Sequence, residues 1–179
     1  MMITMVSKED LIDILKENNL VRYGKFILTD GEVTDYYVDI KYGVTNPKIL
    51  KAISSILSEK IKESNINKVA GPDLGAIPLA VAVSLELKTP LLMVRKERKG
   101  HGTLEIIEGD VNPNDNIALV EDVTVTGGSI LRAIQSIEIY GGTVKKVFVV
   151  VDRESGAIEF LKSKGIILEP LISVSELKN

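Results

Sequence analysis

The segment NIALVEDVTVTGGSILRAIQSI, residues 116–137, joins a strand pattern to a helix pattern through a polar turn. Its first part, NIALV, is apolar and contains β-branched residues, which is typical of a strand buried on both faces. Its last part repeats apolar residues at helical spacing, at Ile130, Ala133, Ile134 and Ile137. The polar turn therefore lies at the carboxyl end of a strand, where open α/β sheets bind their ligands.

The same alternation of strands and helices extends in both directions along the chain. The strand patterns cover residues 68–71, 90–95, 116–122, 144–152 and 166–174. The helix patterns between them cover residues 76–87, 129–140 and 157–165. Strands joined by helices of this length form right-handed crossovers. The sequence therefore predicts an α/β fold with a mainly parallel sheet flanked by helices on both faces.

The N-terminal part has a different pattern. Ser7 and Asp10 form a capping box, which predicts a short helix that ends near residues 18–19. Residues 25–41 place a turn-forming Asp-Gly pair between two β-favouring runs, which predicts a hairpin. Helical spacing resumes at Pro47.

Length and composition favour one soluble domain. We expect residues 1–179 to form it, with an N-terminal hood over about residues 1–45 and a core over about residues 46–179. The net charge of -3 gives no general attraction to nucleic acid or membranes, and neither is an expected partner. The absence of cysteine excludes thiol catalysis and disulfides, and a single histidine disfavours a His-based metal site. With no signal peptide or membrane-spanning run, a cytoplasmic location is expected.

The turn after the strand combines an anion site with two carboxylates. The backbone N–H groups of TGGS, residues 126–129, can converge at a helix N-terminus and bind a phosphate. Glu121 and Asp122 instead favour hydroxyl groups or a cation. A phosphorylated ribose satisfies both halves of the turn. The alternative is a plain glycine turn with a helix cap and solvated carboxylates.

The segment VEDVTVTGGS, residues 120–129, resembles the phosphoribosyl diphosphate (PRPP) binding motif of the type I phosphoribosyltransferases. The resemblance implies the fold of that family, with a small N-terminal hood. It also implies PRPP contacts from Glu121, Asp122, Val123, Thr124, Val125, Thr126, Gly127, Gly128 and Ser129. Val125 departs from the family, which more often has threonine at this place.

The basic segment VRKERKGHGT, residues 94–103, resembles the catalytic loop of the orotate phosphoribosyltransferases. Their R-K-x-x-K-x-H-G pattern is met by Arg95, Lys96, Lys99, His101 and Gly102. By composition alone, a solvated basic turn is the alternative. The resemblance implies PRPP contacts from the four basic residues of the pattern, catalytic roles for Lys99 and His101, and a homodimer in which residues 95–103 reach the neighbouring subunit's site.

Two further segments resemble the same family. GPDLGAIPLA, residues 71–80, is similar to its diphosphate loop, which implies contacts from Asp73, Leu74, Gly75 and Ala76. A helix start capped by Asp73 is compatible with that role. Many bacterial members have lysine in place of Gly75, so that cation is missing from the loop here.

The segment VDRESGA, residues 151–157, matches the family's D-R-x-x-G pattern, which implies that Arg153 binds the orotate carboxylate, with Thr126 as a second orotate contact. A surface ion pair is the alternative for Arg153. The hood segment also resembles the family, but Thr29 replaces a lysine common in bacterial members. Its aromatic residues, Phe26, Tyr36 and Tyr37, are expected to pack or stack.

The resemblance implies transfer of ribose 5-phosphate from PRPP to orotate in pyrimidine synthesis, with catalytic roles for Lys99, His101 and Asp122. It implies Mg²⁺ as cofactor, held mainly by the substrate and without a direct protein ligand set. The alternatives are a phosphoribosyltransferase for another base and a PRPP-sensing regulatory protein. A fused decarboxylase is not expected, because the chain ends at Asn179.

Overall fold

The computed structural model describes residues 6–27, 31, 33–62, 65–96 and 106–178. Its first helix, α1 (Lys8–Glu17), begins with the predicted capping box. The Ser7 hydroxyl accepts a hydrogen bond from the Asp10 N–H at 3.0 Å, and the Asp10 carboxylate accepts one from the Ser7 N–H at 2.9 Å. Two donors that an isolated helix would leave unpaired are thus satisfied, which fixes where α1 begins.

A six-stranded sheet forms the centre of the molecule, with the order β5-β4-β3-β6-β7-β8. The strands are β3 (Lys68–Pro72), β4 (Leu91–Val94), β5 (Ile107–Glu108), β6 (Asn116–Thr124), β7 (Thr143–Asp152) and β8 (Leu168–Ser173). Every neighbouring pair is parallel except β4 and β5. The mainly parallel sheet is confirmed. The sequence did not predict β5, because two residues are too short to show a period.

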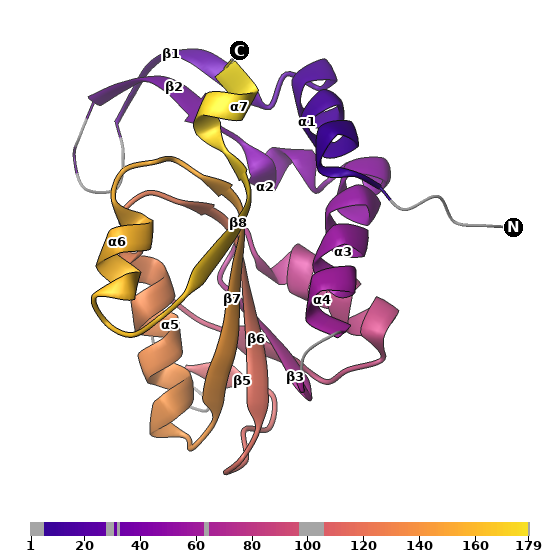
Figure 1. Cartoon of the computed structure of the whole chain (residues 1–179), viewed down its shortest axis with the longest axis vertical. Helices are drawn as coiled ribbons and strands as arrows, with labels where there is room; N and C mark the ends of the chain where they lie inside the picture. Colours follow the sequence, from indigo (N-terminus) through magenta and orange to yellow (C-terminus); the bar gives the residue numbers. More distant parts are fainter. Residues whose placement is uncertain (1–5, 28–30, 32, 63–64, 97–105, 179) are drawn as a thin grey trace, which may run out of the picture.

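Helices cover both faces of the sheet (Figure 1). The helices α3 (Pro47–Lys62) and α4 (Ile77–Leu87) lie on one face, with α1 and α7 (Val174–Lys178) beside them. The helices α5 (Gly128–Ile139) and α6 (Ala157–Lys162) lie on the other. Two buried cores result: along β6, Ala118 and Val120 join the first, and Ile117 and Leu119 join the second. This alternation is the period of two that a strand imposes.

The predicted N-terminal hairpin is confirmed as the antiparallel pair β1 (Val21–Ile27) and β2 (Val33–Val38). A short helix that the sequence did not predict, α2 (Ile40–Gly43), follows it and is capped by Asp39, whose carboxylate accepts from the Tyr42 N–H at 3.0 Å. We call residues 21–43 the hood. In Figure 1 the hairpin lies beyond the upper edge of the sheet, beside the carboxyl ends of its parallel strands.

A buried ion pair ties the strands together at the opposite edge. The Lys68 ammonium lies 3.1 Å from the Asp115 carboxylate, and both side chains are about 10% exposed. Burial alone would raise the pKa of Asp115, but a hydrogen bond from the Asn112 N–H and the charge of Lys68 outweigh it and hold that pKa below its ordinary value. This pair joins the start of β3 to the turn before β6.

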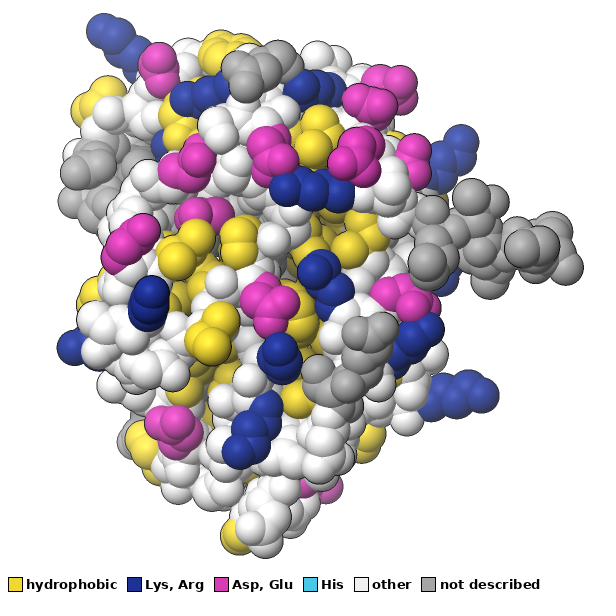
Figure 2. Space-filling view, viewed as in Figure 1, with side chains coloured by type: hydrophobic (Ala, Val, Ile, Leu, Met, Phe, Trp, Pro, Cys, Tyr) yellow, Lys and Arg dark blue, Asp and Glu magenta, His cyan; other side chains and the backbone are white. Residues whose placement is uncertain are grey.

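The face of the molecule shown in Figure 2 carries both positive and negative side chains. Lysine and arginine side chains are interspersed with aspartate and glutamate on the face shown in Figure 2. Within the part of the chain that the structure describes, no helix combines the length and apolar character needed to cross a membrane.

Candidate active site

The two adjacent carboxylates lie on β6, which continues two residues beyond its predicted end to Thr124. Because successive strand residues point to opposite faces, Glu121 borders a cavity on the α5 side and Asp122 borders one on the hood side. We call these the α5-side cavity and the hood-side cavity. Asp122 accepts a hydrogen bond from the Val123 N–H at 2.8 Å, which orients its carboxylate.

Glu121 is a buried acid with an altered proton affinity. Its side chain is 6% exposed, and burial raises the pKa of Glu121 well above its ordinary value. The neighbouring charge of Asp122 raises it further, while a hydrogen bond with Ser129 opposes the shift. Glu121 therefore keeps a proton over a wider pH range than an exposed glutamate does.

The predicted phosphate turn leads directly into α5. Gly127 has φ 81°, a backbone conformation that favours glycine, and a Cβ atom at this position would lie 3.0 Å from the Leu161 Cγ, so that side chain would have to shift. The helix begins at Gly128, and its first N–H groups have no partners within the helix. Thr126 and Ser129 are exposed beside them. The turn can therefore bind an anion at the positive end of α5.

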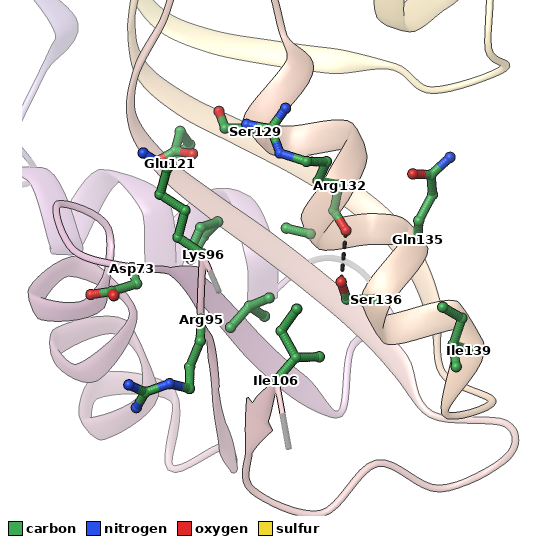
Figure 3. Close-up of a pocket in the computed structure, with 13 residues that line it drawn as sticks. Asp73, Arg95, Lys96, Ile106, Glu121, Ser129, Arg132, Gln135, Ser136 and Ile139 are labelled. Carbon is green, nitrogen blue, oxygen red and sulfur yellow. Dashed lines mark hydrogen bonds between the residues drawn. The ribbon is translucent and has the colours of Figure 1, made fainter. Parts of the chain in front are cut away.

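The α5-side cavity has a volume of about 280 Å³. Its lining residues include the polar Asp73, Lys96, Glu121, Ser129 and Arg132 and the apolar Val94, Ile106 and Ile139. Figure 3 shows Arg132 lying beside Ser129 on α5, whereas the guanidinium of Arg95 points away from Glu121.

The structure shows two features of the basic residues in this cavity that the sequence did not predict. Arg95 has a nitrogen 3.8 Å from the Glu108 carboxylate, so its charge is partly engaged at the sheet edge. Arg132 was not predicted, although its spacing three residues after Ser129 places it one helical turn along α5.

The hood-side cavity, of about 290 Å³, combines charged and apolar walls. It is lined by Ile27, Tyr37, Val38, Lys41, Asp122, Val123, Val125 and Arg153. Thr126, predicted as an orotate contact, is not among the lining residues, and Val123 and Val125 form that wall instead. The Tyr37 ring packs against Phe26 with centroids 5.5 Å apart, as expected for stacking aromatic residues.

Arg153 is buried in this cavity rather than paired at the surface, with 6% of its area exposed. Its Nε donates to the Tyr36 hydroxyl at 3.3 Å, and its Nη2 donates to the Thr34 hydroxyl at 3.0 Å. The guanidinium carbon also lies 4.4 Å from the Tyr36 ring centre. Both of these hydrogen-bond partners, which lie within the described residues, are neutral, so the guanidinium keeps its positive charge for an anionic ligand.

The diphosphate loop, residues 73–76, connects the two cavities to α4. The Asp73 N–H donates to the Val94 carbonyl at 2.7 Å, which ties the loop to β4, and Leu74 is 71% exposed. Asp73 does not cap α4: the residue before the helix is Ala76, which makes no side-chain cap. At Gly75, a Cβ atom would lie 2.0 Å from the Asp122 Oδ2. The bare backbone therefore allows Asp122 to lie against this loop.

Some predicted residues are not covered by the described part of the chain. Lys99, His101, Gly102 and Thr29 lie outside the described residues. Among the residues that are described, no group of three or more histidine, aspartate or glutamate side chains is arranged to hold a metal ion.

Comparison with known proteins shows the family to which the chain is similar. Residues 44–169 match the phosphoribosyl transferase domain family. The orotate phosphoribosyltransferase of Methanosphaera stadtmanae is 50% identical over 96% of both chains.

The fold is also similar to solved structures of orotate phosphoribosyltransferases. The orotate phosphoribosyltransferase from Aeropyrum pernix superposes with a TM-score of 0.82 at 33% identity, covering 93% of this chain and 95% of that one. The Mycobacterium tuberculosis enzyme in complex with PRPP superposes with a TM-score of 0.77 at 26% identity, covering 96% and 99%. The chain belongs to the phosphoribosyltransferases and, within them, to the orotate phosphoribosyltransferase family.

Proposed function

We propose that the two cavities divide the family's reaction between them, with orotate in the hood-side cavity and the phosphates of PRPP around the α5-side cavity. The observation that carries this division is the buried guanidinium of Arg153, whose described hydrogen-bond partners, Tyr36 and Thr34, are neutral and which lines the hood-side cavity. Only an anionic ligand satisfies such a group without a large desolvation cost.

In this arrangement, Arg153 binds the orotate carboxylate through two parallel N–H···O bonds. Val123 and Val125 form an apolar wall for the pyrimidine ring, and Tyr37 lies beside it. Uracil lacks the carboxylate and would leave Arg153 buried without a partner. The site therefore selects orotate by the penalty of an unpaired charge as well as by the contact itself.

PRPP lies across the end of β6. Its 5-phosphate accepts hydrogen bonds from the N–H groups of residues 126–129, and Asp122 and Glu121 bind the ribose hydroxyl groups. Its diphosphate lies against residues 73–76 and Lys96, with Lys99 and His101 supplied by the catalytic loop. As the C1′–O bond breaks, the anomeric carbon becomes cationic and the diphosphate gains negative charge. Positive charge around the diphosphate lowers the barrier because it stabilises that negative charge. Lys99 donates the proton that the diphosphate takes up.

Mg²⁺ would be held mainly by oxygens of the substrate, because Glu121 and Asp122 border separate cavities and the described carboxylates form no ligand set of their own. Bound Mg²⁺ supplies positive charge to the diphosphate.

We also propose a homodimer in which residues 95–103 complete the partner's site. The helix α4 exposes Val81 and Leu85 one turn apart, and Leu74 is exposed in the adjoining diphosphate loop. Exposed apolar side chains on a helix and loop beside the proposed active site support a contact surface there. A cytoplasmic location stays a prediction.

The activity is tested by following the absorbance of orotate with PRPP and Mg²⁺ present, with uracil, adenine, hypoxanthine and guanine as parallel acceptors. The proposal predicts loss of orotate that requires PRPP, with the other bases inert. If PRPP binds but no base is consumed, a PRPP-sensing role replaces the enzymatic one. Consumption of another base in preference to orotate contradicts the assignment of Arg153.

Sharing of the loop is tested with Lys99→Ala, which lacks the proton donor, and Arg153→Ala, assayed at an orotate concentration far below its raised KM so that each variant alone has little activity. When subunits are mixed equally and exchanged, half of the dimers are mixed, and each of these holds one intact site of two. About a quarter of the normal activity should return, from the symmetry of the dimer. No recovery after proven subunit exchange contradicts a loop that acts across the interface.

A further inference from the structure

The side chain of Lys41 joins three segments of the site. It comes from α2 in the hood and borders the hood-side cavity together with Asp122 and Arg153. Its Cγ lies 2.7 Å from the position that a Cβ atom on Gly75 would occupy. Lys41 therefore fills space left by the glycine in the diphosphate loop, and it brings a cation to a loop that contributes none of its own.

The ammonium group of Lys41 has anionic and polar neighbours on several elements. The hydroxyl of Tyr37 on β2 and the carboxylates of Asp122 on β6 and Asp39 before α2 all interact with it. Burial lowers the pKa of Lys41, but these groups outweigh burial and raise the pKa above its ordinary value. Asp39 is shared with Arg22, 3.1 Å away, and Arg153 lines the same cavity. Lys41 thus stays positively charged near neutral pH.

Lys41 and Arg153 are two cations that line one cavity, so they can contact two different regions of a bound orotate. Arg153 is held by Tyr36 and Thr34, which fixes one positive site. Orotate carries its carboxylate on C6, next to the nitrogen N1 that attacks the ribose. Because Lys41 interacts with Asp122, a ring that has its carboxylate on Arg153 and its N1 toward a ribose on Asp122 would direct its N1–C2–O2 edge toward Lys41.

Resting on the proposed function, we propose that Lys41 is a catalytic residue whose ammonium group contacts the N1–C2–O2 edge of bound orotate and stabilises the negative charge that develops there. The N1–H bond breaks and its proton passes to water at the mouth of the cavity. The N1–C1′ bond forms, and the C1′–O bond breaks with its electron pair leaving on the diphosphate. No group is oxidised or reduced. A positioned cation lowers the free energy of this step because it opposes the growing charge on the ring.

The test uses Lys41→Met, which keeps the length of the side chain and removes its charge, with Lys41→Arg as the conservative variant and Lys48→Met on α3 as a matched control. Single-turnover rates are measured with orotate and with 5-fluoroorotate, whose fluorine makes N1–H more acidic. We expect Lys41→Met to slow transfer to orotate by about 100-fold, the typical cost of removing one electrostatic contact to a transition state. Lys41→Arg should keep most of the rate, and Lys48→Met should match the unaltered protein.

The fluorinated substrate separates catalysis from a structural role. Because it needs less help to lose the N1 proton, the defect of Lys41→Met should be roughly five-fold smaller with 5-fluoroorotate, in line with Brønsted behaviour. An equal defect with both acceptors, or a near-normal rate with orotate, overturns the inference. Unaltered protein that is inert toward orotate refutes the proposed function instead, and that result is distinguished before any variant is compared.

Discussion

Replacing Gly75 with alanine should inactivate the site while leaving the fold intact. The added Cβ would lie 2.0 Å from the Asp122 Oδ2 and 2.7 Å from the Lys41 Cγ, whereas ordinary contact begins at 3.4 Å. The Asp122 oxygen must therefore move by about 1.4 Å, the difference between 3.4 and 2.0 Å. Displacement of a reacting group by about 1 Å costs roughly 100-fold in rate, or about 2.7 kcal/mol of transition-state stabilisation.

The thermal stability of Gly75→Ala should change little, in contrast to its kcat. Gly75 does not have a positive φ, so alanine fits the backbone and restricts the unfolded chain, which favours folding by about 0.4–1 kcal/mol. The clashing atoms belong to side chains that border an open cavity and can move. The thermal midpoint should therefore stay within a few degrees of the original value while kcat falls.

The assay is a comparison of kcat and thermal midpoint for Gly75→Ala and Gly142→Ala. At Gly142, a Cβ atom would lie 2.7 Å from the Ile117 Cδ1 and 2.9 Å from the Ile137 Cγ2, which lie near the start of β6 and the end of α5, at the opposite ends of these elements from the proposed substrate contacts. That control should lose stability and keep its kcat when folded. An unchanged kcat in Gly75→Ala would refute the placement of Asp122 at the reacting sugar.

Three further outcomes follow from the same geometry. Glu121→Gln should lower kcat but raise the thermal midpoint near neutral pH. The folded pKa of Glu121 is raised, so the contribution of its protonated side chain to stability is lost as pH rises through that pKa. The stability gained with Gln should therefore vanish in acid, and a gain that persists unchanged in acid contradicts this. Asp115→Asn should destabilise the fold by about 3 kcal/mol in denaturant titrations near neutral pH, because it leaves the Lys68 charge buried. The folded pKa of Asp115 is lowered, so its contribution is present above its unfolded value and lost as pH falls through the folded one, and a deficit that is the same in strong acid argues against the pair. Leu85→Glu should shift sedimentation from dimer to monomer and reduce activity together, and a fully active monomer would exclude the shared loop.

Local patterns predicted the strands, the long helices and the phosphate turn because each is encoded within about ten residues. Continuous apolar runs identified the buried strands, and the Ser7–Asp10 capping box identified the start of α1. The placement of Glu121 and Asp122 beside separate cavities follows from the period of a strand once β6 reaches Thr124. That extension was missed because the carboxylates looked like the end of the strand.

Other parts of the site depend on contacts between distant residues. Arg153 was predicted as an orotate contact, with a surface ion pair as the alternative, and the sequence did not show that its side chain is buried and hydrogen-bonded to Tyr36 and Thr34, which are 117 and 119 residues away in the chain. Lys41 lies in a helix of four residues, too short for a periodic signal, and its role depends on the absence of a side chain at Gly75. Such pairings require the folded arrangement.

The most direct test of the two-cavity account is the orotate KM of Arg153→Ala, measured beside its PRPP KM. Loss of a buried charged contact to a carboxylate should weaken orotate binding by about 2–5 kcal/mol, so the orotate KM should rise by at least roughly 30-fold. The PRPP KM should stay within about two-fold of its original value, because Arg153 lines only the hood-side cavity. An unchanged orotate KM, or an equal rise for both substrates, would contradict the assignment of the hood-side cavity to the base.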